Sequence, residues 1–453
     1  MPPPELDSGG GFLFGRCHHA ARLLYLERLH FRVNMKHHRI SILLAWLLFW
    51  TSGRLLAAGD WPEFRGPTGQ GLSDATGVPV EWNATKNVAW KTEIPGQGWS
   101  SPVLSAGRLY LTTAVGGNGD PVTLHALCLD ADHGKILWDT EIFQPDPVAV
   151  AAMHHKNSTA SPTPIVTADK LYVHFGHMGT AALDLSGKIL WRENVLKYSP
   201  VHGNGGSPIL LGDELIFNCD GASDPFMAAL DAATGHVKWR TPQNALVRNK
   251  FSFCTPLAIE VDGATQVISP ASGFVGGYDP TNGHELWRVR YGDGYSVVPR
   301  PVFAHGLIYI SSGFDSPVVY AINPAGAHGD VTDTHVAWKH RKGGPTTPSL
   351  LVVGDNLYCV SDLGIASCVD AVTGNLHWTH RFDGKFSASP VAAEGRVYFQ
   401  NEDGVGFVIK AGTSFEQLAE NDLGERSLAS YAVTDHALFI RTEKHLWKIA
   451  AGG

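Results

Sequence analysis

The stretch Ala229-Leu-Asp-Ala-Ala-Thr-Gly-His-Val-Lys-Trp239 decides the fold, because close variants of it recur along most of the chain. Each variant joins a short apolar run, an Asp, a Gly turn and a closing Trp, and four others end at Trp138, Trp191, Trp287 and Trp378. The tryptophans at positions 90, 138, 191, 239, 287, 338 and 378 are separated by 48, 53, 48, 48, 51 and 40 residues. Such a period indicates a repeat architecture.

Each repeat contains four short strands. Alternating runs such as Arg108-Leu-Tyr-Leu-Thr-Thr113 are bounded by turn residues every eight to twelve positions, and no stretch has a helical period. In the Asp-x-x-Thr-Gly turn the carboxylate caps backbone amides and Gly supplies a positive φ. The first strand follows a Ser/Thr-Pro step, which is tolerated at the head of a strand. These steps are Ser101-Pro102, Ser161-Pro162, Ser207-Pro208, Thr255-Pro256, Thr347-Pro348 and Ser389-Pro390.

Four-stranded antiparallel units repeated radially predict an all-β propeller. Six units close at the tryptophans from Trp138 to Trp378, and a seventh runs from Ser389 to near Leu418. The last stretch, residues 427–450, holds only three strands, and Asn87-Val-Ala-Trp-Lys91 supplies a fourth from the other end. Pairing them would remove an exposed sheet edge. We therefore expect eight blades, the last closed by the N-terminal strand; seven blades with a frayed tail is the alternative.

The N-terminal residues have the layout of a secretory signal. Met35-Lys-His-His-Arg39 is basic, residues 40–50 are apolar, and Ala57-Ala-Gly59 offers a cleavage site. We expect residues 1–34 to be an upstream extension, 35–58 a signal peptide and 59–453 one propeller domain, located in the periplasm or secreted. The alternative is a membrane anchor, but an eleven-residue run is shorter than the ~20 residues of a span. We expect no stable membrane span after cleavage.

Charge and cysteine content limit the partners and the redox chemistry. The first 58 residues hold seven of the 35 Lys and Arg residues and three of the 43 Asp and Glu residues, so the remainder has a net charge of −12. This argues against a nucleic-acid partner. Cys359 and Cys368 flank a hairpin, and either a cross-strand disulfide or two buried thiols is compatible with their spacing. We expect a monomer.

The repeated motif Ala-x-Asp-x-x-Thr-Gly-x-x-x-Trp resembles the tryptophan-docking motif of the pyrroloquinoline-quinone (PQQ) repeat propellers. That family includes the quinoprotein alcohol dehydrogenases and the outer-membrane assembly lipoprotein BamB. Trp61-Pro-Glu-Phe-Arg-Gly-Pro67, with Gly69 and Gly71, also resembles the opening of secreted PQQ-like propellers. The resemblance covers about residues 60–450 and implies that each Trp and Gly joins one blade to the next. The expected docking residues are Trp90, Trp138, Trp191, Trp239, Trp287, Trp338 and Trp378.

The resemblance does not extend to a cofactor site. The alcohol-dehydrogenase branch holds its quinone on an adjacent Cys-Cys disulfide ring, over calcium bound by Glu, Asn and Asp. This chain has no adjacent cysteine pair. We therefore expect no cofactor, with PQQ and calcium as the alternative.

Candidate binding residues lie in the links between blades and in the middle hairpin loops, which share one face of a propeller. This face is predicted to carry a polar, concave ligand site, although loops are also polar simply because they are hydrated. The candidates are Trp99, Lys156, Asn157, His177, His202, Asn204, Asp220, Lys250, Tyr295, Arg300, Asp315 and Arg441.

We expect no metal site and no catalytic residue. His154 and His155 are adjacent and would point to opposite sides of an extended segment. Asp130-Ala-Asp-His-Gly134 has its Gly one place early for a calcium loop, and its first Asp is the turn residue of the repeat. The sequence thus predicts a secreted, non-catalytic propeller that binds a protein, small-molecule or carbohydrate ligand. The alternative is a PQQ-dependent oxidoreductase that holds the quinone through Lys156, Arg300 or Arg441.

Overall fold

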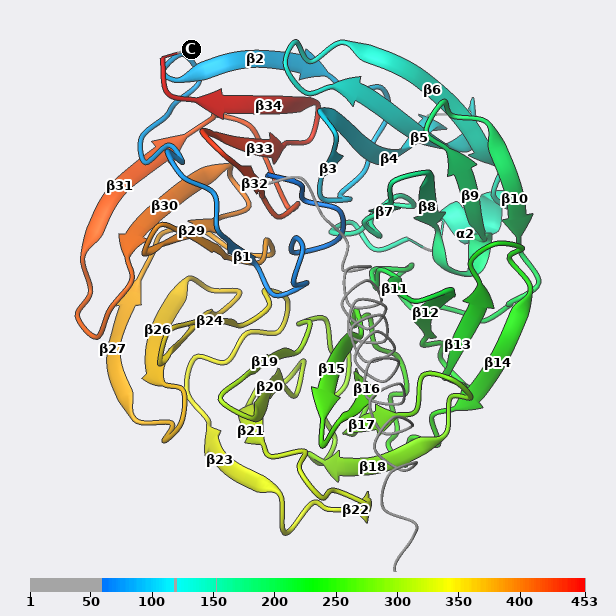
Figure 1. Ribbon diagram of the computed structural model, residues 1–453, viewed down its shortest axis with the longest axis vertical. Coiled ribbons are helices and arrows are strands. Elements are labelled where there is room, and N and C mark those ends of the chain that lie inside the picture. The colour runs from blue at the N-terminus through cyan, green and yellow to red at the C-terminus, as the bar shows by residue number, and fades with distance from the viewer. Residues whose placement is uncertain (1–58, 118–119, 152, 453) are drawn as a thin grey trace, which may run out of the picture. The chain divides into compact units, whose positions relative to one another are not determined.

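The computed structural model describes residues 59–117, 120–151 and 153–452, and over these residues the chain forms eight sheets around a common axis (Figure 1). Each sheet holds four antiparallel strands, which in seven of the sheets follow chain order from the axis outward, and two sheets carry one extra strand. The prediction of eight four-stranded blades is confirmed. The predicted upstream extension and signal peptide, residues 1–58, lie outside the described residues.

The first four blades follow one another along the chain. Blade one contains β3 (Val103–Ser105), β4 (Arg108–Gly117), β5 (Asp120–Asp130) and β6 (Ile136–Phe143). Blade two contains β7 (Ile165–Val166), β8 (Lys170–His174), β9 (Thr180–Asp184) and β10 (Ile189–Glu193). Blade three contains β11 (Ile209–Leu211), β12 (Glu214–Cys219), β13 (Phe226–Asp231) and β14 (Val237–Pro242). Blade four contains β15 (Leu257–Val261), β16 (Ala264–Ala271), β17 (Phe274–Tyr278) and β18 (Glu285–Arg290).

The remaining blades complete the ring. Blade five contains β19 (Val302–Ala304), β20 (Leu307–Ser311), β21 (Val319–Ile322) and β23 (Val336–His340). Blade six contains β24 (Leu351–Val353), β25 (Asn356–Val360), β26 (Ile365–Asp370) and β27 (Leu376–Arg381). Blade seven contains β28 (Val391–Ala393), β29 (Arg396–Gln400), β30 (Val405–Lys410) and β31 (Gln417–Asp422). The extra strands are β1 (Leu72–Ser73), which pairs with β28, and β22 (Gly329–Asp330), which pairs with β18.

Blade eight is built from both ends of the domain. It contains β32 (Ala432–Thr434), β33 (Ala437–Arg441), β34 (His445–Ala450) and, as its outer strand, β2 (Val88–Glu93). The strand β2 pairs antiparallel with β34, with Trp90 opposite Lys448. The predicted closure by the N-terminal strand is confirmed, and the alternative of seven blades with a frayed tail is wrong.

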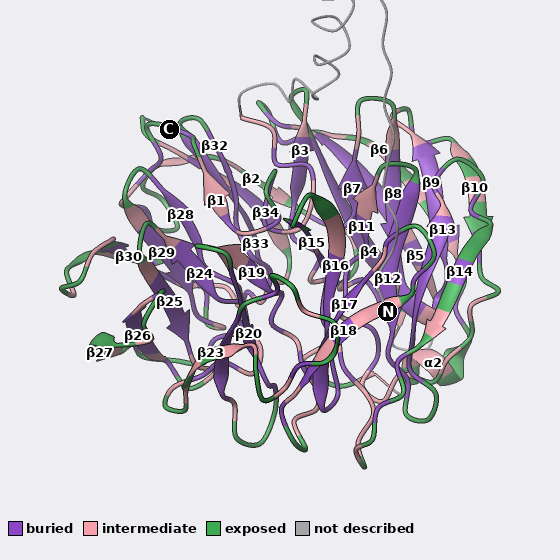
Figure 2. Cartoon of the chain, turned by 60° about the horizontal axis from the view of Figure 1, so that its bottom comes forward, coloured by how far each residue is buried: buried purple, intermediate pink, exposed green. Residues whose placement is uncertain are grey.

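Burial follows the position of a strand within its blade. The middle strands are covered on both faces by neighbouring blades, so β12 is buried along its whole length, whereas the outer strand β14 is mostly exposed. Figure 2 shows this change from buried inner strands to exposed outer ones. Short helical segments occur only in loops of the described part, as α2 (Pro147–Ala151) and the 3-10 turn η1 (Gly176–Met178).

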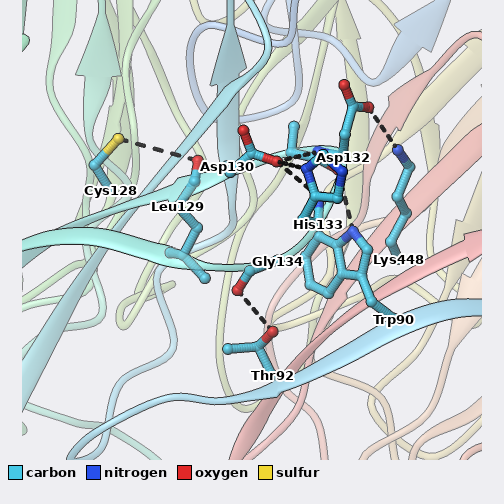
Figure 3. A network of polar contacts seen from close by, with 10 residues as sticks. Trp90, Thr92, Cys128, Leu129, Asp130, Asp132, His133, Gly134 and Lys448 are labelled. Atoms are coloured by element: carbon cyan, nitrogen blue, oxygen red, sulfur yellow. Dashed lines mark hydrogen bonds and ion pairs between the residues drawn. The ribbon is translucent and has the colours of Figure 1, made fainter.

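Tryptophans join most blades to the next by one repeated contact. At the closing blade, Trp90 donates through Nε1 to Ala131 O at 3.1 Å, and Gly134 of blade one lies against the indole (Figure 3). Asp130 caps that turn by accepting from the backbone of His133 at 2.7 Å. The same indole-to-carbonyl bond, 2.8–3.2 Å long, is made to the following blade by Trp138, Trp191, Trp239, Trp338 and Trp378.

Trp287 is different, because the turn of the next blade is longer there. Its indole donates to Gln266 in its own blade at 2.8 Å, and β22 from the expanded turn of blade five pairs alongside it. The side chain is fully buried. Trp287 is therefore covered by an added strand rather than by a Gly turn.

The five cysteines in the described residues are buried and not bonded to one another. Cys359 lies opposite Ser367, and Cys368 lies opposite Tyr358, so the two cysteines that flank the hairpin are out of register with each other. The hairpin thus holds buried thiols rather than the cross-strand disulfide.

Candidate binding pocket in the central channel

The two ends of the innermost strands carry different parts of the chain. Each innermost strand begins after a blade link and ends at its first hairpin turn, so the links and the middle hairpin loops meet at one end. Residues 60–82, here called the crossing segment, lie at the other end of the innermost strands. Trp61 exchanges two hydrogen bonds of 2.8 Å with Leu104 at the end of β3, which places the segment opposite the links.

The crossing segment contacts blades all around the ring. Pro62 O accepts from Val166 in blade two at 2.9 Å, and Gln70 Oε1 accepts from the backbone of Phe303 in blade five at 2.6 Å. Gly71 O accepts from Ala392 in blade seven at 2.8 Å. Thr76 then donates to Asp435 in blade eight. This segment closes that end of the channel, and the other end is the mouth.

A circle of hydroxyl groups surrounds the axis just before the innermost strands. In each step a backbone N–H of one blade donates to the side-chain oxygen of the next, at 2.9–3.1 Å. We call these residues the hydroxyl ring: Ser101, Thr163, Ser207, Thr255, Ser349, Ser389 and Ser430. Two predicted Ser/Thr-Pro steps, Ser161-Pro162 and Thr347-Pro348, lie two residues before the ring positions Thr163 and Ser349.

Arg300 takes the place of the hydroxyl in blade five. Its backbone N–H continues the ring by donating to Ser349 Oγ at 3.0 Å, but its side chain turns toward the closed end. The guanidinium donates to Pro256 O at 3.0 Å and to Phe64 O at 2.6 Å, with a Glu63 carboxylate oxygen 3.4 Å away. Burial lowers the pKa of Arg300, and Glu63 compensates only in part. Arg300 therefore fixes the crossing segment to the ring.

A cavity of about 480 Å³ occupies the channel between the hydroxyl ring and the mouth. All seven ring residues line it, and Phe64 of the crossing segment does so as well. Its other walls come from the links and middle loops of several blades. They include Trp99, His154, Lys156, Asn157, His202, Phe251, Phe253, Tyr295, Phe314 and Asp362.

One side of the pocket is a continuous row of aromatic rings. The centroids are 5.0 Å apart from His154 to His202, 5.3 Å from His202 to Phe251 and 5.4 Å from Phe251 to Tyr295. Tyr295 then lies 5.7 Å from Phe314, which is about half exposed. We call these five residues the aromatic wall. Burial lowers the pKa of His154, and the neighbouring His155 adds to this effect.

An ion pair crosses the mouth. Lys156, in the link between blades one and two, lies 2.7 Å from Glu402 in the middle loop of blade seven. Ser387 also donates to Glu402, at 2.7 Å. Partial burial alone would raise the pKa of Glu402, but the hydrogen bonds from Lys156 and Ser387 outweigh it and lower the pKa. The Glu402 carboxylate is therefore charged at neutral pH and pairs with the Lys156 ammonium.

Comparison with known proteins agrees with this architecture. The family model described as outer membrane protein assembly factor BamB matches residues 72–200, 125–350 and 315–442. The chain belongs to the PQQ-like repeat propeller family. A comparison with curated proteins returned no match.

Solved structures share the fold at low sequence identity. The crystal structure of BamB from Moraxella catarrhalis has a TM-score of 0.55 at 14% identity, covering 79% of this chain and 98% of that chain. The computationally designed Ika8 protein has a TM-score of 0.54 at 10% identity, covering 83% and 100%. Quinohemoprotein alcohol dehydrogenase from Comamonas testosteroni has a TM-score of 0.44 at 13% identity, covering 88% and 82%. The first two likenesses establish the fold alone.

Five of the twelve candidate residues line this PQQ-like propeller's pocket. They are Trp99, Lys156, Asn157, His202 and Tyr295. Asn157 also joins its own link to the next one, because its amide donates to His202 O at 2.9 Å while its carbonyl oxygen accepts from Ser161.

The other seven candidates do not line the pocket. Arg300 holds the crossing segment, and Arg441 is buried where blade eight meets blade one, donating to Ser100 Oγ at 2.6 Å and Thr112 O at 2.9 Å. Asn204 is buried and accepts from the Tyr198 hydroxyl at 2.6 Å. Lys250 is partly exposed and Asp315 is exposed.

His177 and Asp220 lie in the middle hairpin loops of blades two and three. His177 is half-buried with its ring 5.8 Å from that of Tyr198, and burial lowers its pKa. Asp220 is 4% exposed, and neither of its carboxylate oxygens has a hydrogen-bond partner within the described structure. Burial raises the pKa of Asp220 well above its ordinary value.

The sequence-based candidates included Trp99 and Tyr295 but left out the phenylalanines of the site. Phe251, Phe253 and Phe314 stand in or beside the same links and loops as the polar candidates, so their position in the repeat was a usable signal. The hydroxyl ring was also detectable, as a Ser or Thr recurring at the head of seven innermost strands.

Neither the His154–His155 pair nor the turn at residues 130–134 is part of a group of metal ligands in the described residues. Among the described residues, no cluster of three or more His, Cys, Asp or Glu side chains is placed to hold a metal ion. His154 lines the pocket and its ring lies 4.1 Å from that of His155. In the described part of the chain, no helix has the length and apolar character that a membrane crossing requires.

Proposed function

We propose that this chain is a secreted, non-catalytic binding module that holds part of a protein or carbohydrate ligand at the mouth of its central channel. The observation that carries the proposal is the pocket, in which links from several blades bring aromatic faces and hydroxyl groups around about 480 Å³. Ligand sites are typically concave cavities of roughly 300–1,000 Å³, largely apolar with a few placed polar groups. The structure of BamB from Moraxella catarrhalis supports a scaffold of this shape.

The charged groups of the pocket favour binding over catalysis. Lys156 and Glu402 neutralise each other. Asp362, in the middle loop of blade six, accepts from the backbone of Thr346 at 2.7 Å and from the Thr347 hydroxyl at 2.6 Å, so its carboxylate joins that loop to the link before the blade. A general base or nucleophile needs a reactive group that faces the substrate with its proton-transfer partner beside it.

The residues around the pocket do not fit PQQ. The three carboxylates of this quinone need at least two converging cations, and Lys156 is the one Lys or Arg among the described lining residues. Arg300 and Arg441 are buried in hydrogen bonds to backbone groups elsewhere. The pocket therefore offers the quinone one cation, and that cation is already paired.

Binding is tested by screening the labelled full chain against a glycan array and a displayed peptide library. We expect at least one ligand whose binding is weakened tenfold or more by Tyr295→Ala, because this substitution removes one ring of the aromatic wall and its contacts with the ligand. The control Asp315→Asn, at an exposed position outside the pocket where the positive φ of 85° is kept by Asn, should bind as the parent does. Ligands indifferent to Tyr295→Ala, or none from either library, would contradict the proposal.

The oxidoreductase alternative has its own test. Calorimetric titration of the full chain with PQQ and excess calcium should give no saturable heat. One-to-one binding that is lost in Lys156→Ala would establish a quinoprotein and overturn the proposed function.

Secretion rests on the basic and apolar run of residues 35–58. Expression of the full chain in a Gram-negative host, followed by N-terminal sequencing of the periplasmic fraction, should give a mature chain that begins near Gly59. Retention of residues 35–58 on a membrane-bound product would favour the anchor instead.

A further inference from the structure

We infer that the ligand of this pocket is a neutral carbohydrate, whose terminal sugar rings enter the mouth and lie against the aromatic wall. The inference rests on the proposed binding function and names the class of its ligand. Three properties of the pocket lead to it. Its backbone donors are already used, and its free polar groups are hydroxyls beside aromatic faces. Its two charged lining residues already have partners: Lys156 pairs with Glu402, and Asp362 accepts from Thr346 and Thr347.

Backbone groups around the channel are not available to an extended peptide. Peptides that add a strand to a sheet edge bind through main-chain hydrogen bonds. Here the N–H groups at the head of seven innermost strands donate to the hydroxyl ring or, in Ser430, back to Ser101. Further along, the N–H groups of Leu104, Val166 and Ala392 donate to the crossing segment. A ligand in the pocket therefore meets side chains rather than a free strand edge.

The side chains that remain match the two surfaces of a sugar. Each ring hydroxyl of Ser101, Thr163, Ser207 and Thr255 accepts an N–H through one lone pair, so its O–H can donate into the channel. The hydroxyl groups of a saccharide both donate and accept, and its C–H faces are apolar. The rings of His202, Phe251 and Tyr295 meet nearly edge to face, at 86° and 78°, so the aromatic wall presents separate apolar ring faces beside the hydroxyls, and a sugar's C–H face can pack on one of them.

The charge balance favours a neutral ligand. The ammonium of Lys156 and the carboxylate of Glu402 lie 2.7 Å apart at the mouth, with 33% and 12% of their side chains exposed. A pair of adjacent sugar hydroxyls can accept from the ammonium and donate to the carboxylate without separating unlike charges. An acidic sugar would instead compete with Glu402 for the one lining lysine and would leave one of the two carboxylates unpaired.

The pocket is tested by isothermal titration of the full chain with defined oligosaccharides. The probes are neutral gluco-, xylo- and N-acetylglucosamine oligomers, the matching uronic-acid oligomers, and peptides selected from the displayed library. We expect saturable binding of at least one neutral series. Glu402→Gln and Tyr295→Ala should each weaken it at least tenfold. The control Glu416→Gln removes another Lys–Glu pair of blade seven, 3.2 Å from Lys410 and outside the pocket, and should leave binding unchanged.

The outcomes separate this inference from the proposed function. If selected peptides bind in a manner that depends on Tyr295 and no neutral saccharide does, the binding function stands and the carbohydrate inference fails. Tighter binding of the uronic-acid series than of the neutral one overturns the neutral class. If nothing that binds depends on Tyr295, both proposals fail. Circular dichroism and unfolding midpoints of each variant confirm that loss of binding is not loss of folding.

Discussion

The two ends of the central channel use similar residues for different purposes. At the closed end Arg300 is almost completely buried, and its guanidinium bonds to carbonyl oxygens of the crossing segment and of blade four. At the mouth Lys156 is one-third exposed and pairs with Glu402 beside an open cavity. Both cations lie in links between blades, Arg300 at a position of the hydroxyl ring and Lys156 seven residues before the ring position Thr163. Membership of a link therefore does not settle the role of a charged residue, because its burial and its partners decide whether it is structural or available to a ligand.

The largest expected effect is at the closed end. Arg300→Met removes the buried guanidinium that donates to the carbonyl oxygens of Phe64 and Pro256 and that lies 3.4 Å from the Glu63 carboxylate. Removing one partner of a buried ionic contact typically costs about 3–5 kcal/mol. We expect a loss of that size in the free energy of unfolding, measured by urea titration. Arg248→Met, on an exposed loop residue, is the control and should change it little.

If Arg300→Met were as stable as the parent, the crossing segment would be held mainly by its backbone contacts. Gly69→Ala then provides a second measurement. Gly69 has φ +66°, and an added Cβ would lie 2.6 Å from Arg300 Nη1. Destabilisation by Gly69→Ala but not by Arg300→Met would assign the closure to the backbone.

The second effect concerns a carboxyl in the middle loop of blade three and depends on pH. Asp220 is buried without a hydrogen-bond partner in the described structure, and its pKa is raised well above the ordinary value by burial. The titratable side chains that interact electrostatically with Asp220 are Tyr198, Cys219, Cys254, Tyr278 and Tyr291. Burial raises the pKa of each of them, so each is neutral in the folded state. Among the described residues, no cation lowers the pKa of the Asp220 carboxyl group.

The sign follows from proton binding. Between the unfolded pKa near 4 and the higher folded pKa, the folded state binds more protons, so Asp220 lowers stability as pH rises. Asp220→Asn removes that dependence. Relative to the parent, we expect the free energy of unfolding of the variant to increase by about 1.4 kcal/mol for each pH unit across this window. Unfolding midpoints at pH 5 and pH 8 measure the gain, and Asp224→Asn in the same loop is the control. If the stability difference between variant and parent were the same at pH 5 and at pH 8, the proposed titration of Asp220 would be contradicted.

The repeat made the fold predictable, because five of the eight blades repeat the same Asp cap, Gly turn and Trp within their own sequence. Closure by β2 was also predictable, since the last unit lacked one strand and the N-terminus offered it. The direction of a link side chain was not. Arg300 turns toward Phe64, 236 residues earlier in the chain, and Arg441 toward Ser100, 341 residues earlier. Such partners are set by ring closure, which no local pattern records.

A third, smaller effect on stability is expected in the hydroxyl ring, which lies between the two ends of the channel. Ser349 Oγ accepts from the backbone of Arg300 and from the Ser389 hydroxyl, both at 3.0 Å. Ser349→Ala leaves the buried N–H of Arg300 without an acceptor, which costs about 1–3 kcal/mol. Ser367→Ala is a matched control, because that buried serine of blade six has no hydrogen-bond partner within the described structure. Equal stability of the two variants by urea titration would show that the hydroxyl ring does not support the blades.

The smallest effect on stability is expected at the mouth, and there it separates stability from binding. Lys156→Met removes a partly exposed ion pair, and such pairs contribute about 0–1 kcal/mol because solvent screens them. Without the ammonium, burial dominates at Glu402 and its pKa should rise, since the hydrogen bond from Lys156 is one cause of its present depression. We therefore expect nearly unchanged urea unfolding at pH 7 but clearly weaker saccharide binding. Lys410→Met, which breaks an exposed pair of blade seven, should change neither. A loss of several kcal/mol in Lys156→Met would mean that the pair fastens the link across the channel, and the mouth would then resemble the closed end.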